Sequence, residues 1–120
     1  APGSRIEGIG RPRVEPSGIR TLVDRMEEGA AADAIAAMQA LSQLLGRRVG
    51  PSTGTNFVAM LRLAAEMRAA GEQGAILSLL CDAGERYLPT YYDADWVQTR
   101  MGDCGPARAR IDALLQSCRA

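Results

Sequence analysis

One apolar run, from Ala75 to Leu80, most limits the folds open to this chain. Only Ser78 interrupts it, so it lacks the polar–apolar alternation of a strand with one face in water. A run of this kind is typical of a strand covered on both faces in a parallel sheet. A second strand is predicted at Arg47 to Gly50. The helical pattern between the two runs predicts a crossover unit, in which a helix joins two parallel strands.

Helical spacing of apolar residues recurs along the rest of the chain. It predicts helices over 19–28, from Asp33 to a stop at Gly46, from a polar turn at 51–56 onward to Gly71, and over 107–118. A third strand is expected at 5–10, where it runs into a glycine turn. The alternation predicts an α/β fold. Three strands are too few for a parallel sheet covered on both faces, so we expect part of a larger sheet.

Charge and residue content exclude several kinds of function. The 14 basic residues, all of them Arg, balance 14 acidic residues, so no strong field attracts nucleic acid or an anionic membrane. The chain holds no Lys and no His. It therefore lacks both a Schiff-base amine for a carbonyl cofactor and the usual base that titrates near neutral pH.

The cysteines indicate a reducing environment. Cys81, Cys104 and Cys118 are odd in number and form no C-x-x-C pair, a pattern that fits neither a disulfide framework nor a zinc site. No apolar stretch reaches the length of a membrane span, and the N-terminus has no signal-peptide pattern. We expect a cytoplasmic protein without a metal site, a nucleic-acid partner or a membrane partner.

Three motifs, in order along the chain, resemble those of one enzyme family. They are Gly8-Ile9-Gly10, Gly50-Pro51-Ser52-Thr53-Gly54 and Gly84-Glu85-Arg86-Tyr87-Leu88-Pro89-Thr90. They are similar to the G-I-G turn, the G-I-S-S-G loop and the G-E-R-Y-L-S-T stretch of the cysteine synthase family, in fold type II of the pyridoxal phosphate (PLP) enzymes. Bacterial cysteine synthase-like and cysteine desulfhydrase members look most similar. The resemblance covers roughly residues 4–96, and no single motif would suffice for it.

The resemblance implies a three-layer, parallel-sheet fold that is incomplete in this chain. Residues 1–100 would form the C-terminal part of the PLP-dependent catalytic domain, and 101–120 a peripheral C-terminal helix. The family's lysine motif, its asparagine loop for the substrate carboxylate and its glycine-rich phosphate-binding loop come earlier and have no counterpart here. The N-terminal portion of the same enzyme, or a second chain, would have to supply the Lys and the phosphate-binding loop. A homodimer of the complete enzyme is also implied.

Ser52 matches the family serine whose hydroxyl hydrogen-bonds the pyridine nitrogen of PLP. A neutral hydroxyl leaves that nitrogen largely unprotonated, so the ring is a weaker electron sink, and elimination of a β-substituent is favoured over transamination. From its loop alone, a helix N-cap is the simpler interpretation of Ser52. Both roles can coexist, because a cap uses a lone pair of the oxygen while the ring nitrogen takes the proton.

The resemblance places further residues near the cofactor. Gly8-Ile9-Gly10 matches a turn that passes beside the ring, and Cys81 and Asp82 stand where the family usually has Pro-Ser near the pyridine nitrogen. Arg11 and Arg13 flank the glycine turn and are weaker candidates to hold an anionic group of the substrate. Ordinary alternatives stay open: a common turn for the glycines, packing for Cys81, and a solvated surface for the two arginines.

These observations predict the C-terminal portion of a PLP-dependent enzyme of cysteine metabolism with an amino-acid substrate. Such an enzyme either forms cysteine from an activated serine and sulfide or releases hydrogen sulfide from cysteine. The alternative is a non-catalytic, truncated relative that acts as a protein-interaction module and binds its partner through an open sheet edge.

Overall fold

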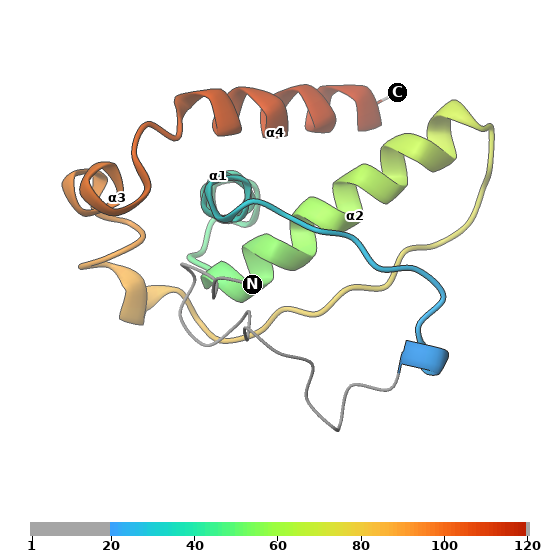
Figure 1. The fold of residues 1–120 in the computed structure, drawn as a ribbon. Helices are drawn as coiled ribbons and strands as arrows, with labels where there is room; N and C mark the ends of the chain where they lie inside the picture. Colours follow the sequence, from blue (N-terminus) through green and yellow to red (C-terminus); the bar gives the residue numbers. More distant parts are fainter. Residues whose placement is uncertain (1–19, 120) are drawn as a thin grey trace.

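A computed structural model describes residues 20–119, and the regular structure of this part is helical (Figure 1). Its α-helices are α1 (Ala31–Leu45), α2 (Pro51–Ala69), α3 (Ala94–Met101) and α4 (Gly105–Cys118). Two single-turn 3-10 helices, η1 (Arg20–Leu22) and η2 (Glu85–Tyr87), lie in the connections. The described residues contain no β-strand, and one isolated antiparallel bridge joins Val49 to Ala83.

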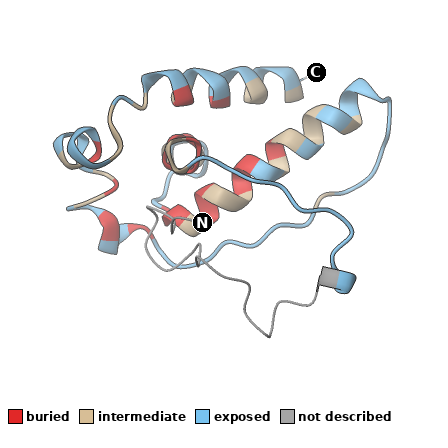
Figure 2. Ribbon diagram, in the orientation of Figure 1, coloured by how far each residue is buried: buried red, intermediate tan, exposed pale blue. Residues whose placement is uncertain are grey.

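Helices α1, α2 and α4 pack together around the main core, with α1 between the other two (Figure 1). The inward face of α1 consists largely of alanines, which allow the neighbouring helices to approach closely. The buried side chains of this core are Ala36, Ala37, Ala40, Phe57, Val58, Leu61, Ala107 and Ile111. In Figure 2 the buried residues are concentrated on α1 and on the N-terminal half of α2.

A second buried cluster joins α1 to the segment around η2 and α3. Its members are Ile35, Met38, Val49, Tyr87, Tyr91 and Val97. Tyr91 contributes aromatic contacts in two directions, with ring centroids 5.5 Å from Tyr87 and 5.0 Å from Trp96. This cluster packs the segment around η2 against α1, and Val49, which lies just before the start of α2, belongs to the same cluster.

The predictions for α1 and α4 are confirmed. Gly46 ends α1 with φ 69°, the left-handed conformation that glycine adopts without strain. The predicted polar turn at 51–56 is wrong, because α2 already begins at Pro51. Proline favours the first helical position, where it lacks only an N–H that would have no partner inside the helix.

The helix predicted at 19–28 is wrong for the described residues of that range. Only the short η1 forms there, and 23–30 has no regular structure. The apolar side chains that suggested a helical face remain in water, as Leu22 and Met26 are 79% and 69% exposed. A single helix of about ten residues is marginal without a packed face, which explains its absence.

The two predicted strands within the described residues do not form. Arg47 to Gly50 contributes only the bridge at Val49, and Ala75 to Leu80 is extended chain without regular structure. Leu77 is 96% exposed, and the whole segment lies at the surface (Figure 2). A strand needs the hydrogen bonds of a neighbouring strand, and the described residues supply none for this run. The third predicted strand, at 5–10, lies outside the described residues.

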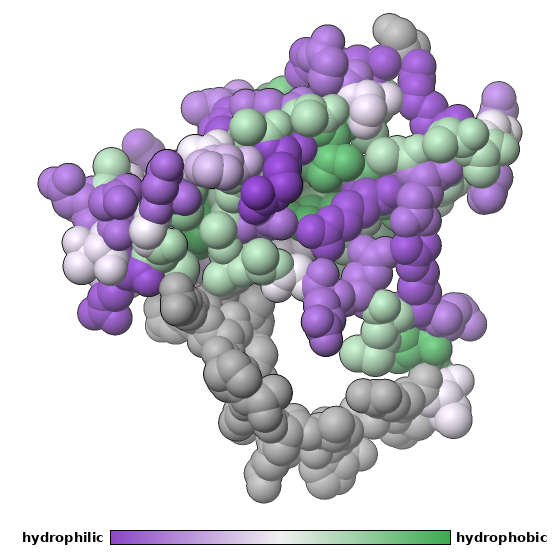
Figure 3. Space-filling model, turned by 45° about the horizontal axis from the view of Figure 1, so that its top comes forward, coloured by the Kyte–Doolittle hydropathy of each residue, from purple (hydrophilic) through white to green (hydrophobic). Residues whose placement is uncertain are grey.

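The sheet of the predicted α/β fold is therefore not present in the described part of this chain. The proposed division at residue 100 stays a prediction, although α4 places Ala107 and Ile111 in the shared core. Some apolar side chains remain at the surface among charged ones (Figure 3). Among the described helices, none has the length and apolarity needed to cross a membrane.

Candidate functional site

The start of α2 carries the serine that the sequence singles out. Gly50 is the N-cap residue, Pro51 is the first helical residue, and Ser52 follows within the first turn. The N-cap interpretation of Ser52 is therefore wrong. Ser52 is half-buried, and its hydroxyl makes no hydrogen bond to another described residue. The hydroxyl is therefore not engaged by any other described residue.

Cys81 and Asp82, two of the predicted cofactor-site residues, lie at the start of α2. The backbone N–H of Cys81 donates to Thr53 Oγ1 over 2.9 Å. The side-chain amide of Asn56 donates to the carbonyl oxygen of Leu79 over 3.2 Å. These two bonds fasten the end of the extended run to the first turns of α2, although the two segments are more than twenty residues apart in sequence.

Gly50 and Asp82 are packed so closely that no side chain fits between them. A Cβ atom at Gly50 would lie 2.5 Å from Asp82 Oδ1 and 2.9 Å from Tyr87 Cε2. The Tyr87 hydroxyl donates to Asp82 Oδ2 over 2.6 Å, and Arg86 Nη1 lies 3.6 Å from the same oxygen. The Asp82 carboxylate is thus already engaged by its own turn.

The remaining predicted site residues lie outside the described part of the chain. These are Gly8-Ile9-Gly10, Arg11 and Arg13. Their roles stay predictions.

Several residues that shape this site were not singled out from the sequence. Thr53, Asn56 and Tyr87 hold the extended run and Asp82 against the start of α2. The sequence did carry a signal for the close packing of these segments, namely the glycines Gly50 and Gly84. At Gly50 an added Cβ atom would collide with the side chains of Asp82 and Tyr87, and at Gly84 it would collide with neighbouring backbone, with Val49 O at 2.6 Å.

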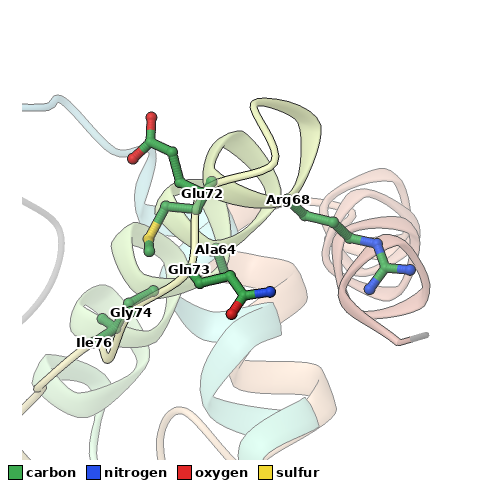
Figure 4. A pocket seen from close by; sticks show the side chains of 7 residues that line it. Ala64, Arg68, Glu72, Gln73, Gly74 and Ile76 are labelled. Atoms are coloured by element: carbon green, nitrogen blue, oxygen red, sulfur yellow. The ribbon is translucent and has the colours of Figure 1, made fainter.

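Another hollow lies at the opposite end of α2 and does not form a comparable site (Figure 4). Its lining is Ala64, Met67, Arg68, Glu72, Gln73, Gly74 and Ile76. Figure 4 shows the charged side chains of Arg68 and Glu72 pointing away from one another. The two charged groups of this hollow therefore do not converge on a common point.

The residues at the start of α2 fit one edge of PLP and no more. Ser52 offers a neutral hydroxyl of the kind that can meet a pyridine nitrogen, and the turn beside it is narrow because Gly50 has no side chain. The chain contains no Lys, so it offers no amine for the covalent attachment of this cofactor. It could contribute a contact to the ring but could not hold PLP by itself.

The chain corresponds to the C-terminal third of a cysteine synthase-family protein, which confirms the resemblance that its motifs indicated. That relative is L-cysteine desulfhydrase Cds1 of Mycobacterium tuberculosis (strain ATCC 25177 / H37Ra). The two are 50% identical over 117 residues, which make up 97% of this chain and 32% of the relative. The chain thus spans about a third of the relative's length. No family model and no solved structure matches the chain.

Proposed function

We propose that this chain forms the C-terminal portion of a PLP-dependent enzyme that acts on the Cβ–S bond of cysteine. Of the two directions that the sequence left open, the name of the relative favours release of hydrogen sulfide from L-cysteine over synthesis from an activated serine. The observation that carries the proposal is the 50% identity to a cysteine desulfhydrase across nearly the whole chain.

Ser52 is the residue through which this chain would act on the cofactor. When bound, PLP supplies an electron sink for bond breaking around the substrate Cα. The Ser52 hydroxyl would donate to the ring nitrogen and hold the ring in place without adding charge. Asp82 lies against Gly50, two residues before Ser52, but Tyr87 and Arg86 already engage its carboxylate. The geometry therefore favours a neutral partner for the ring.

The remainder of the enzyme would have to supply the Lys and the phosphate-binding loop. Two features support a larger assembly. The relative is about three times as long as this chain. The run from Ile76 to Leu80 lines an apolar groove with Leu41, Leu45, Phe57 and Met60, yet most of the run is exposed. A neighbouring strand from the N-terminal portion of the enzyme would pair with this run and cover it.

A non-catalytic interaction module remains a second candidate, because the same exposed run would also pair with a strand of another protein. The two proposals differ in what the complete protein contains. An enzyme needs a Lys at the cofactor, and a module does not.

Both candidates are tested by preparing the complete protein and this chain in parallel. The enzyme proposal predicts that the complete protein carries the visible absorption of bound PLP and releases sulfide from L-cysteine. This chain alone should do neither, because it lacks a Lys. A folded complete protein that stays colourless with added PLP and forms a stable complex through this chain would overturn the enzyme proposal and favour the module.

A further inference from the structure

A cluster of hydrogen bonds holds the backbone just ahead of Ser52. The Tyr92 hydroxyl donates to the carbonyl oxygen of Val49 over 2.6 Å and lies 2.6 Å from Ser42 Oγ. The N–H of Val49 in turn donates to Tyr92 Oη, at 3.1 Å, and to Ser42 Oγ, at 3.2 Å. Both polar groups of the Val49 backbone are therefore satisfied by side chains, those of Tyr92, far along the sequence, and of the nearby Ser42.

Position 49 matters because so little chain separates it from Ser52. Val49 is 1% exposed, and only Gly50 and Pro51 come between it and Ser52. The ring of Pro51 fixes its own φ. On the other side of the chain, the N–H of Gly84 donates to Arg48 O over 3.1 Å. Few rotatable backbone bonds therefore lie between Val49 and Ser52, so a shift of Val49 should also move the Ser52 hydroxyl.

We propose that Tyr92 is a positioning residue for Ser52, acting through Val49 to set where the Ser52 hydroxyl meets the ring nitrogen of the cofactor. This inference rests on the proposed function. Tyr92 comes from the turn that follows η2, and Ser42 comes from α1. The cluster thus links the helix before Ser52 and the turn after the extended run to the start of α2.

The hydroxyl of Tyr92, rather than its ring, is the group that acts. The ring is partly buried and packs against the cluster of Ile35, Met38, Val49, Tyr87, Tyr91 and Val97. Tyr92→Phe keeps this packing and removes the donor to Val49 O. Ser42 can still accept from the Val49 N–H, so the chain retains part of its anchorage. The expected consequence is a displaced Ser52 in a folded protein.

The test uses the complete, PLP-loaded protein with Tyr92→Phe, Ser52→Ala and the double variant. Loss of the neutral hydroxyl that donates to Val49 O and accepts from Val49 N–H predicts that Tyr92→Phe lowers kcat about three- to tenfold, with KM within about twofold because the substrate does not touch Tyr92. The absorption and fluorescence bands of the bound cofactor should change in the same direction as in Ser52→Ala. In the Ser52→Ala background, Tyr92→Phe should change kcat and the spectra by less than about twofold, since residues that act as a unit are not additive.

Two further variants serve as a second test of the cluster and as a control. Ser42→Ala should produce the same spectral change in weaker form. Ser117→Ala removes a hydroxyl that donates to Leu114 O on the exposed side of α4, and should leave the spectrum and kcat unchanged. A Tyr92→Phe protein with wild-type kcat and spectra, or equal effects of Tyr92→Phe with and without Ser52, overturns the inference alone. A wild-type protein that binds no PLP overturns the proposed function, and the inference with it.

Discussion

Arg110 on α4 is paired with Asp33 on α1, with Arg110 Nη2 2.6 Å and Nε 3.2 Å from the same oxygen, Asp33 Oδ1. The other oxygen, Oδ2, lies 3.3 Å from Nη2 of Arg62 on α2. The Asp33 side chain is only 8% exposed, whereas those of Arg62 and Arg110 are 33% and 57% exposed. One buried carboxylate therefore links all three helices of the main core.

Replacing Asp33 should destabilise the chain. Asp33→Asn removes the charge that both arginines face, while the arginines remain partly in water, so we expect a loss of about 1–3 kcal/mol in the free energy of unfolding. Urea unfolding measures this loss in the free energy of unfolding. Asp112→Asn is the matched control, because Asp112 pairs with Arg108 at an exposed position on α4. The control should cost no more than about 0.5 kcal/mol. Equal losses in the two variants would contradict the linking role of Asp33.

The contact between α1 and α2 should not tolerate a methyl group at Gly54. A Cβ there would collide with the carbonyl oxygen of Ala34 and lie 2.9 Å from Met38 Cβ. Since a backbone carbonyl cannot simply rotate away, Gly54→Ala should cost about 1–3 kcal/mol or more. Gly29→Ala, where nothing lies within 4 Å, should change the free energy by less than about 0.5 kcal/mol. Thermal unfolding of both variants measures the two losses of stability, and equal losses would contradict the tight contact at Gly54.

The helices of the core could be predicted because their signals are local. The stop at Gly46 and the apolar spacing of α1 and α4 depend on residues within one or two turns. Pro51 misled the prediction for α2, because proline is equally common in turns and at the first helical position. The helix expected at 19–28 failed because its apolar side chains find no partner among the described residues, which local spacing does not reveal.

The candidate site was predicted from motifs, and its geometry was not. The sequence placed Cys81 and Asp82 near Ser52 only through a family resemblance. The bonds that bring them there, from Cys81 to Thr53 and from Tyr87 to Asp82, join side chains whose pairing depends on the tertiary fold. For the run from Ala75 to Leu80, the sequence pattern was clear but the predicted strand did not form. Its pattern is that of a covered strand, but the pattern alone does not show whether the described residues supply the cover, and they do not.

Cys104 should react slowly with thiol reagents. Burial raises the pKa of its thiol, and the neighbouring Asp103 carboxylate raises that pKa further. At a given pH the thiol therefore holds less of the reactive thiolate, and its alkylation by iodoacetamide should rise at a higher pH than that of a free thiol. Asp103→Asn should move this rise toward lower pH. A pH–rate profile for Cys104 that coincides with that of a small-molecule thiol would contradict the prediction.

The extended run should change its hydrogen exchange when the rest of the enzyme is present. In this chain alone, the amides of 76–80 pair with no strand among the described residues and lie at the surface, so they should exchange at nearly the rate of an unfolded peptide. Pairing in a sheet should slow them by about two orders of magnitude or more. Amides of α1 serve as the protected reference in both samples. Fast exchange of 76–80 in the complete protein would rule out the proposed strand pairing.

Nuclear magnetic resonance of the complete protein, loaded with PLP that carries ¹⁵N in its ring, tests the role of Ser52 most directly. We expect a wild-type nitrogen signal typical of an unprotonated, hydrogen-bonded pyridine. The signal should be displaced in Ser52→Ala and moved toward the protonated form in Ser52→Asp, where a carboxylate faces the ring. Ser117→Ala should leave the signal in place. A nitrogen signal that is the same in wild type, Ser52→Ala and Ser52→Asp would show that this hydroxyl does not meet the ring.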